Sequence, residues 1–376
     1  MRVLNLLNKT LTAALFLMTF LFVNVSEANS SDSNVLHKLE VKSKDGGGTL
    51  LFSDSPEYVK ENGILYSDTV KGDVRIMFYH LNDSNINKRI AVVAENLSDK
   101  PNVIDITRGV MSEPDGNFLK VGKTTQSDYL QKDFNYALYL QKGESNHIID
   151  EINNKVIKPG QLVYGVYDFH TANEVRVSVI MYPENDDPFE FIKTAKVLSK
   201  DEHKLRGTFV KMNRVINLKK VYDPDTDGMV YVMLADDVND VFKMGIDATD
   251  GSTTKDFGNY GIAYTINMKI KKGKKARIGL TPLGGNYAGA MRVYYNGETK
   301  LLLVPNGKPY FGDKTPREPE SVKKMREASM SLITDYTELS DLGTYSDDVR
   351  FEFSPPGASY LPVYIVLMPA DSETDS

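Results

Sequence analysis

Short runs of β-branched and aromatic residues, separated by turn-forming residues, recur along this sequence and constrain its fold more than any other feature. Examples are "GDVRIMFYHL", "RIAVVAENL", "EVRVSVIMYP" and "LPVYIVLMP", and Gly, Asn, Asp and Pro stand between such runs. This cadence is typical of antiparallel sandwiches. We therefore predict an all-β fold made of two consecutive β-sandwich domains with one or two short helices.

The segment between Pro183 and Lys204 is the best candidate for a domain junction. It turns acidic and then mixed in charge, and Pro183 and Pro188 interrupt strand pairing there. We place a linker at 186–204, between an N-terminal, immunoglobulin-like β-sandwich domain at 35–185 and a C-terminal β-sandwich domain at 205–370.

Three local patterns carry further structural predictions. The stretch 318–333 has the apolar spacing of a helix, and Pro319 suits its first turn. The stretch 122–134, "GKTTQSDYLQKDF", fits either a short helix or a crossing loop. Asn296-Gly297 favours a two-residue hairpin, because both residues accept positive φ.

The N-terminus predicts export. Arg2 and Lys9 precede an apolar run from Leu11 to Val25, and Ser26-Glu27-Ala28 provides small residues for signal peptidase. We predict a signal peptide at 1–28 and a secreted, extracellular protein, associated with the cell wall and without an integral membrane span after cleavage. The chain has no cysteine, which excludes disulfides, thiolate metal sites and a lipid anchor on cysteine.

Two glycine-rich stretches raise the question of phosphate binding. Gly258-Asn259-Tyr260-Gly261 and Gly284-Gly285-Asn286-Tyr287-Ala288-Gly289 both lead into strand-like runs. A phosphate-binding loop leads into a helix N-terminus instead. We therefore predict packed turns, with each tyrosine ring lying on a neighbouring strand.

These stretches also carry a family resemblance. "FGNYGI", "LTPLGGNYAGAMRVYYNG" and "FEFSPPGASYLPVYIVLMP" resemble a group of uncharacterised secreted proteins of Gram-positive bacteria, which often carry a copper amine oxidase-like N-terminal stalk module. That module is not seen here. The resemblance implies an extracytoplasmic β-rich protein.

Known catalytic motifs find no match. None of the five histidines stands in a His-x-His pair, and no Asn-Tyr pair is followed by an acidic residue, so the chain is not a copper amine oxidase. His-Glu-x-x-His and Gly-x-Ser-x-Gly are absent. His80 and His170 could share a metal only if their strand ends meet, and each is better explained as a strand-end histidine bonded to a loop.

"YDPDTDGMVY" is the best candidate for a metal site. Asp223, Asp225 and Asp227 before Gly228 match the first half of a calcium loop, but Leu234 stands where the closing Glu of an EF-hand belongs. A Ca²⁺ site and an ordinary acidic turn both fit these residues. No other cofactor is predicted.

"MKIKKGKKARIG" concentrates positive charge in a chain whose formal net charge is −6. Such a cluster could bind an anionic cell-wall polymer or phospholipid head groups, or be the solvated tip of a hairpin. The residues of this candidate polymer-binding site are Lys269, Lys271, Lys272, Lys274, Lys275 and Arg277.

The acidic balance argues against nucleic acid as a partner. We predict a non-enzymatic envelope-associated protein that acts in adhesion or cell-wall polymer binding. Two alternatives stay open: an extracellular glycan hydrolase on a β scaffold, which needs a cleft with two carboxylates, and a purely architectural surface protein.

Overall fold

A computed structural model of the protein describes residues 35–131, 133–150, 154–282, 285–312, 330–332 and 339–370. The predicted signal peptide lies outside the described residues, as does most of the predicted helix at 318–333. The end of that helix prediction was wrong, because Met330–Leu332 form strand β20, which pairs antiparallel with β1 (Val35–Lys38).

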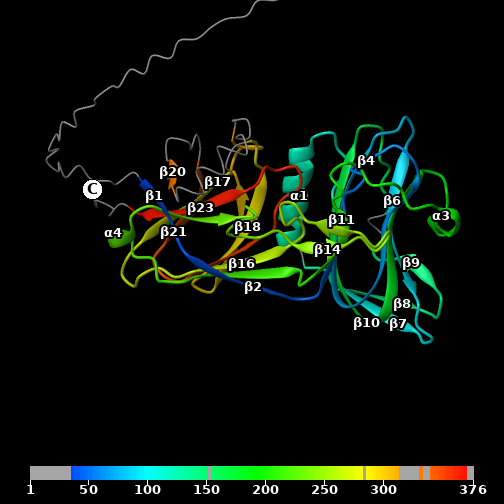
Figure 1. Ribbon diagram of the computed structural model, residues 1–376, viewed down its shortest axis with the longest axis horizontal. Helices are drawn as coiled ribbons and strands as arrows, with labels where there is room; N and C mark the ends of the chain where they lie inside the picture. The colour runs from blue at the N-terminus through cyan, green and yellow to red at the C-terminus, as the bar shows by residue number, and fades with distance from the viewer. Residues whose placement is uncertain are drawn as a thin grey trace, which may run out of the picture. The chain divides into compact units, whose positions relative to one another are not determined.

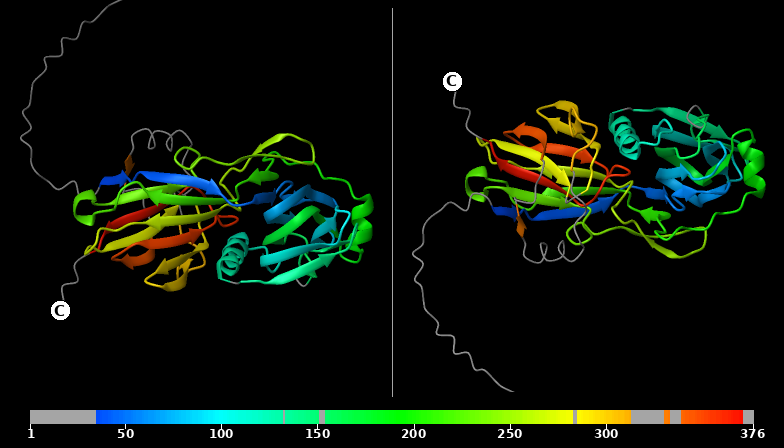
Figure 2. Two further views of the ribbon diagram at one scale, coloured as in Figure 1. Left: turned by 90° about the horizontal axis from the view of Figure 1, so that it is seen from below. Right: turned by 90° about the horizontal axis from the view of Figure 1, so that it is seen from above.

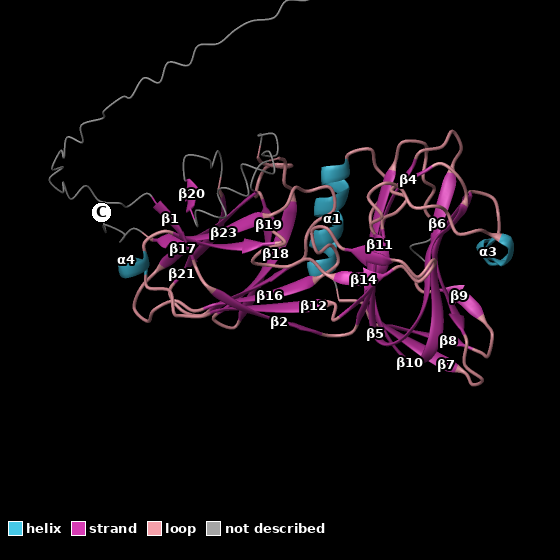
Figure 3. Ribbon diagram, in the orientation of Figure 1, coloured by secondary structure: helices cyan, strands magenta, loops and turns pink. Residues whose placement is uncertain are grey.

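The described chain is dominated by strands, which confirms the prediction of an all-β fold built from β-sandwiches (Figure 3). Two six-stranded sheets form one sandwich. Sheet A has the strand order β20-β1-β13-β23-β17-β21, and sheet B has the order β19-β18-β22-β16-β12-β2. Buried residues of both sheets, such as Ile278 and Ile365 of sheet A and Ile266 and Phe351 of sheet B, belong to one apolar cluster.

The strands of this sandwich have the following bounds: β2 Val41–Gly46, β12 Asn213–Leu218, β13 Val230–Leu234, β16 Ala263–Met268, β17 Ala276–Pro282, β18 Gly289–Tyr295, β19 Glu298–Val304, β21 Ser340–Tyr345, β22 Val349–Phe353 and β23 Val363–Pro369.

Sheet C has eleven strands and surrounds a core of its own. Its main path is β15-β14-β11-β3-β5-β10-β6-β9; β4 pairs with β5, and β7 pairs with β10 and β8. One edge of β10 pairs with β7 over 165–171 and with β6 over 175–183, so the sheet divides there and its parts enclose the core. The bounds are β3 Thr49–Ser53, β4 Tyr58–Val59, β5 Gly63–Asn82, β6 Lys88–Asn96, β7 Asn102–Met111, β8 Tyr136–Leu140, β9 Ser145–His147, β10 Leu162–Pro183, β11 Arg206–Val210, β14 Met244–Ile246 and β15 Thr253–Lys255.

Strand β5 separates two cores. Successive side chains of a strand point to opposite faces. Val74, Ile76 and Phe78 therefore enter the core of sheet C, whereas Met77 and Tyr79 join the apolar cluster that sheets A and B share. Residues 74 to 82 are all buried, so both faces of this part of β5 are covered.

Strand pairing crosses the predicted domain junction. β1 and β2, at the start of the described chain, pair with β13 and β12, whereas β11 pairs with β3 of sheet C. Figures 1 and 2 show the blue strand β2 running beside green and yellow strands from the second half of the chain. The predicted boundaries at 185 and 205 stay a prediction, and residues on either side of them share sheets.

The undecided stretch 122–134 is helical over most of its length. Helix α1 (Phe118–Gln131) contacts β18 of sheet B and β10 and β7 of sheet C, and Figure 1 shows it standing between these strands. Val121, Thr125 and Tyr129 follow a four-residue spacing and are buried, which makes one apolar face. Gly122 lets the helix approach the backbone of Gly357, because a Cβ atom there would lie 2.0 Å from the carbonyl oxygen of Gly357.

Two short helices complete the described elements. α3 (Pro188–Thr194) lies inside the predicted linker and is capped by Asp187, whose carboxylate accepts from the backbone N–H groups of Phe189 and Glu190. α4 (Pro224–Asp227) is a single turn. Among the described residues, no helix combines the length and the apolar character needed to span a bilayer.

The predictions about the turns are confirmed in part. Asn296 and Gly297 have φ values of 51° and 77° and join the antiparallel strands β18 and β19. The two glycine turns open β16 and β18 rather than helices. Tyr260 stacks on Phe52 of β3, with ring centroids 6.4 Å apart. Tyr287 packs against Phe311, which lies outside the named strands, and Gly284 lies outside the described residues.

Candidate functional site

A row of three charged residues crosses the middle of sheet C. Asp168 of β10 pairs directly with Arg75 of β5 on one side and with Arg108 of β7 on the other. Directly opposed residues of neighbouring strands point to the same face. One carboxylate therefore lies between two guanidinium groups on the face that looks toward sheet B.

Arg75 is a structural cation at the centre of this row. Its Nε and Nη2 donate to the two carboxylate oxygens of Asp168, both at 2.8 Å, and its Nη1 donates to the backbone carbonyls of Met212 and Gly261 at 3.0 Å. Arg75 is 4% exposed. Burial lowers its pKa, but the Asp168 carboxylate outweighs that effect and the pKa of Arg75 is raised. It therefore stays charged and ties β5 to the segments that enter β12 and β16.

Tyr129 of α1 completes this cluster. Its hydroxyl donates to Oδ2 of Asp168 at 2.8 Å, so both carboxylate oxygens are occupied. The Arg108 guanidinium carbon lies 5.2 Å from the centroid of the Tyr129 ring, and that of Arg75 lies 5.5 Å from it. Burial, the largest effect, raises the pKa of the Tyr129 hydroxyl, so this hydroxyl stays a proton donor.

Arg108 differs from Arg75 because it has no counter-ion of its own. Within the part of the chain that the structure describes, no carboxylate lies within ion-pair distance of its guanidinium group. Burial lowers its pKa, but the nearby Tyr129, Asp168 and Glu352 act in the opposite direction and the pKa of Arg108 is raised. A charged guanidinium group is thus held on an aromatic ring with hydrogen-bond donors to spare.

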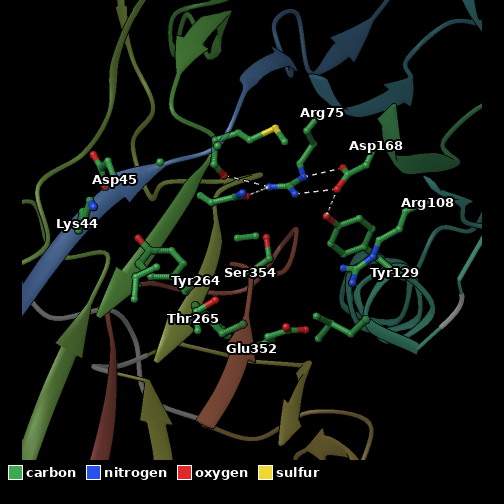
Figure 4. A pocket seen from close by; sticks show the side chains of 18 residues that line it. Lys44, Asp45, Arg75, Arg108, Tyr129, Asp168, Tyr264, Thr265, Glu352 and Ser354 are labelled. Carbon is green, nitrogen blue, oxygen red and sulfur yellow. Dashed lines mark hydrogen bonds and ion pairs between the residues drawn. The ribbon is translucent and has the colours of Figure 1, made fainter. Parts of the chain in front are cut away.

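These residues line a pocket of about 540 Å³, which we call the Arg108 pocket (Figure 4). This volume lies within the roughly 300–1,000 Å³ of small-molecule sites. Arg75, Arg108, Asp168 and Tyr129 form one wall; the facing wall comes from β2, β16 and β22. Its labelled members in Figure 4 are Lys44, Asp45, Tyr264, Thr265, Glu352 and Ser354.

The carboxylates of the facing wall differ in their partners. Asp45 is bound by Arg214 and Lys243, at 2.7 and 2.5 Å. Burial raises its pKa, but these two hydrogen bonds outweigh burial and the pKa of Asp45 is lowered. Oε2 of Glu352 forms an ion pair with Nη1 of Arg292 at 3.6 Å, but it is buried and accepts no hydrogen bond. Glu352 is therefore the carboxylate of this pocket that keeps acceptor capacity for a ligand.

The structure separates His80 from His170. His80 lies opposite Val163 and His170 opposite Asp73, seven residues further along the same pair of strands. At the rise of a β-strand this is roughly 23 Å. His80 is buried, its Nε2 lies 2.9 Å from the Ser53 hydroxyl and its Nδ1 lies 2.9 Å from the Pro56 carbonyl oxygen. The two histidines therefore do not form a shared metal site. His170 lies within β10 rather than at a strand end, and its Nδ1 lies 2.7 Å from Oδ1 of Asp73.

The predicted calcium and polymer-binding segments lie against each other. Lys271 pairs with Asp223 at 2.5 Å, and Lys274 pairs with Asp225. Asp227 pairs with Lys220 at 2.5 Å. Each of the three predicted calcium ligands thus has a lysine partner, and the described residues contain no group of three His, Asp or Glu side chains placed to hold a metal ion.

The predicted lysine hairpin is not a hairpin. β16, before it, belongs to sheet B, and β17, after it, belongs to sheet A, so residues 269–275 cross from one sheet to the other. Ile270 is buried and forms a β-bridge with Tyr222, which holds this crossing against the acidic turn. Arg277 pairs with Asp341 at 3.1 Å. Among the residues that the structure describes, no ion pair involves Lys269, Lys272 or Lys275, so these three side chains are available to a binding partner.

Sequence reasoning missed Arg75, Arg108 and Asp168. Each is a charged residue within a largely apolar strand-like run, and charged residues are rarely buried unless they are paired. A charge within an apolar run therefore identifies each of these residues as a candidate for a buried ion pair. It does not show that the three share one row, because the pairing of the strands is not visible in the sequence.

Comparisons with known proteins add little to this description. No protein-family model and no curated protein matches the chain. A solved structure described as the CUB1-EGF-CUB2 domain of human MASP-1/3 is similar over 88% of this chain and 99% of its own length, with 8% sequence identity and a TM-score of 0.20. A TM-score this low supports no argument about fold or function. The resemblance to secreted Gram-positive proteins stays a prediction.

Proposed function

We propose that the protein is a secreted, non-enzymatic binding protein of the cell envelope, and that its Arg108 pocket holds an acidic sugar of a cell-wall polymer. One observation carries the proposal: the Arg108 guanidinium lies on the Tyr129 ring, inside a pocket, without a carboxylate partner among the described residues. A guanidinium group binds a carboxylate through two parallel hydrogen bonds.

The rest of the pocket suits a polyhydroxylated ligand. Glu352 keeps a buried oxygen that can accept a sugar hydroxyl, and Thr265 and Ser354 add polar groups beside it. Leaving a buried acceptor without a partner is unfavourable, so a hydroxyl that donates to Glu352 would satisfy it. An acidic sugar matches both walls, because it offers a carboxylate to Arg108 and hydroxyls to Glu352.

The same contacts favour binding over glycan hydrolysis at this pocket. A glycoside hydrolase uses two carboxyl groups that are available to the substrate. Asp168 is fully occupied by Arg75 and Tyr129, and Asp45 is held by Arg214 and Lys243. Glu352 alone does not make a catalytic pair.

The proposal is tested by retention of the mature protein on purified cell wall. We expect Arg108→Gln to lower retention strongly, because the wall carboxylates lose their guanidinium partner. Arg176→Gln is the matched control, since Arg176 is an exposed arginine of the same sheet that pairs with Glu95 at 2.8 Å. Equal retention of wild type, Arg108→Gln and Arg176→Gln would overturn the proposal.

A further inference from the structure

A second hollow lies at the meeting of four separate segments of the chain, away from the Arg108 pocket. Two cavities of about 640 and 170 Å³ adjoin each other, because Glu57, Tyr79, Tyr260 and Ala358 line both of them. None of their lining residues lines the Arg108 pocket. We call the two together the acidic–aromatic cleft and define it by Asp54, Glu57, Tyr79, Phe257, Tyr260 and Tyr360.

All charged side chains that line the cleft are acidic, and only some of them have partners. The Asp236 carboxylate accepts from the backbone N–H groups of Asn239 and Asp240, and Lys255 Nζ lies 2.5 Å from Asp237. In contrast, Oδ1 of Asp54 is buried without a hydrogen-bond partner.

Asp54 and Glu57 lack a counter-ion. Neither carboxyl group has a lysine or arginine within ion-pair distance among the described residues. The inner hollow of about 170 Å³ is lined by both of them. Two carboxyl groups therefore border one small cavity without a cation.

The electrostatics of these two groups follow from their surroundings. Burial is the main reason why the pKa of Asp54 is well above its ordinary value, and Glu57, Asp201 and Asp256 add to it. The pKa of Glu57 is also raised, first by burial and then by Asp201, with His203 acting in the opposite direction. Without a cation in the cleft, protons neutralise part of this acidity.

The walls of the cleft are aromatic. Tyr79 and Tyr260 line both hollows, and Tyr260 is fixed by its stacking on Phe52 and by the hydrogen bond from its hydroxyl to the Ser359 carbonyl at 3.2 Å. Phe257 and Tyr360 belong to the outer hollow and are 53% and 46% exposed. Aromatic faces attract cations, and the attraction strengthens where water is excluded.

We propose that the acidic–aromatic cleft binds an organic ammonium group, with its positive charge against Asp54 and Glu57. The carbon atoms of the ligand lie against the rings of Tyr79, Tyr260 and Tyr360. The cavity, the unpaired carboxyl groups and the aromatic walls all match this ligand chemistry. The site is independent of the acidic-sugar site, so either can fail alone.

Isothermal titration calorimetry with three small probes tests this site. Choline carries a quaternary ammonium group, ethanolamine carries a primary one, and 3,3-dimethylbutan-1-ol has the shape of choline without its charge. We expect at least one ammonium probe to bind at least about tenfold more tightly than the neutral alcohol. The better of the two ammonium probes identifies the head group.

Proton release gives a second readout. A cation that ionises Asp54 and Glu57 displaces their protons, so the measured heat depends on the buffer and affinity rises with pH through the raised pKa values. Asp54→Asn and Tyr360→Leu should each weaken binding, whereas Asp99→Asn, at a carboxylate that is 89% exposed, should not. Arg108→Gln should leave ammonium binding unchanged.

The calorimetric results for the probes and variants can overturn the ammonium-binding proposal. Variants are compared only after their thermal unfolding shows that they are folded, and Tyr360→Leu serves where Asp54→Asn is unstable. No heat from either ammonium probe up to about 10 mM, or equal affinity for the neutral alcohol, overturns it. So does binding that is identical in Asp54→Asn, Tyr360→Leu and Asp99→Asn.

Discussion

Asp168 and Arg75 face each other directly across β10 and β5, and two hydrogen bonds of 2.8 Å join their side chains. Arg75 also donates to the carbonyls of Met212 and Gly261, which precede strands β12 and β16 of sheet B. The pair therefore connects sheet C to sheet B and fixes the wall on which Arg108 and Tyr129 lie.

Asp168→Asn should destabilise the protein strongly. It removes the charge partner of a buried arginine and leaves two guanidinium groups without a carboxylate between them. Loss of one partner of a buried ion pair costs roughly 3–5 kcal/mol. Urea unfolding measures the change, and Glu95→Gln, at the exposed pair with Arg176, is the control, with an expected loss below about 1 kcal/mol. Similar losses in both variants would mean that the Arg75–Asp168 pair does not support the fold.

His80 should make the protein less stable in acid. Burial is the largest cause that lowers its pKa to about 4 in the folded state, from 6.5. As the pH falls from 6.5 toward 4, the unfolded chain takes up a proton that folded His80 does not, so this stabilisation is lost. The shift corresponds to about 3 kcal/mol at most.

The raised pKa of Asp54 acts in the opposite direction, so the pH dependence of His80 is measured as a difference between wild type and His80→Gln. Denaturant unfolding at pH 7 and at pH 4.5 supplies it. The difference should shrink at the lower pH, because only the unfolded wild-type chain takes up the additional proton. A difference that stays constant would contradict a neutral His80.

Gly122→Ala should destabilise the protein even though alanine favours helices. The added methyl group would meet the Gly357 carbonyl oxygen at 2.0 Å, so α1 must move away from that backbone. Overpacking of this kind costs roughly 1–3 kcal/mol. Thermal unfolding checks this, with Gly46→Ala as the control, because an added Cβ there meets nothing within 4 Å and Gly46 has no positive φ. An unchanged or higher melting temperature for Gly122→Ala would contradict the close approach.

Substitutions in the acidic turn should change polymer binding by the lysine segment at 269–275, because ion pairs join the two segments. Asp223→Asn with Asp225→Asn frees Lys271 and Lys274, so retention on anionic wall polymer at low salt should rise and its salt dependence should steepen. A chelator should leave the melting temperature of the wild type unchanged if the turn is held by lysines. A rise in melting temperature on adding Ca²⁺, lost in the double variant, would support the calcium interpretation.

The sequence indicates local structure well in this protein. The strand-like runs, the Asn296-Gly297 hairpin and the strand-opening glycine turns depend on neighbours in the chain, and the structure confirms them. Which sheet a strand joins, in contrast, depends on its pairing with strands that are far away in the sequence. The lysine segment reads as a hairpin, but β16 and β17 find their partners in different sheets.

The candidate sites were hidden for the same reason. Arg75, Arg108 and Asp168 come from three strands, and only the register of β5, β10 and β7 places them in one row. The acidic–aromatic cleft combines residues near 54, 79, 257 and 360, which no local pattern connects. Asp223 and Lys271 were each identified from the sequence, but not the ion pair between them.

A double-mutant cycle between protein and ligand tests the central claim most directly. Affinity is measured for wild type and Arg108→Gln, each with an oligosaccharide of galacturonic acid and with its carboxyl-reduced galactose counterpart. A charge-assisted hydrogen bond is worth roughly 1.5–3 kcal/mol, so wild type should prefer the acid by about 10- to 150-fold. Arg108→Gln should lose that preference. Equal preference for the acid in both proteins would contradict binding of the carboxylate by Arg108.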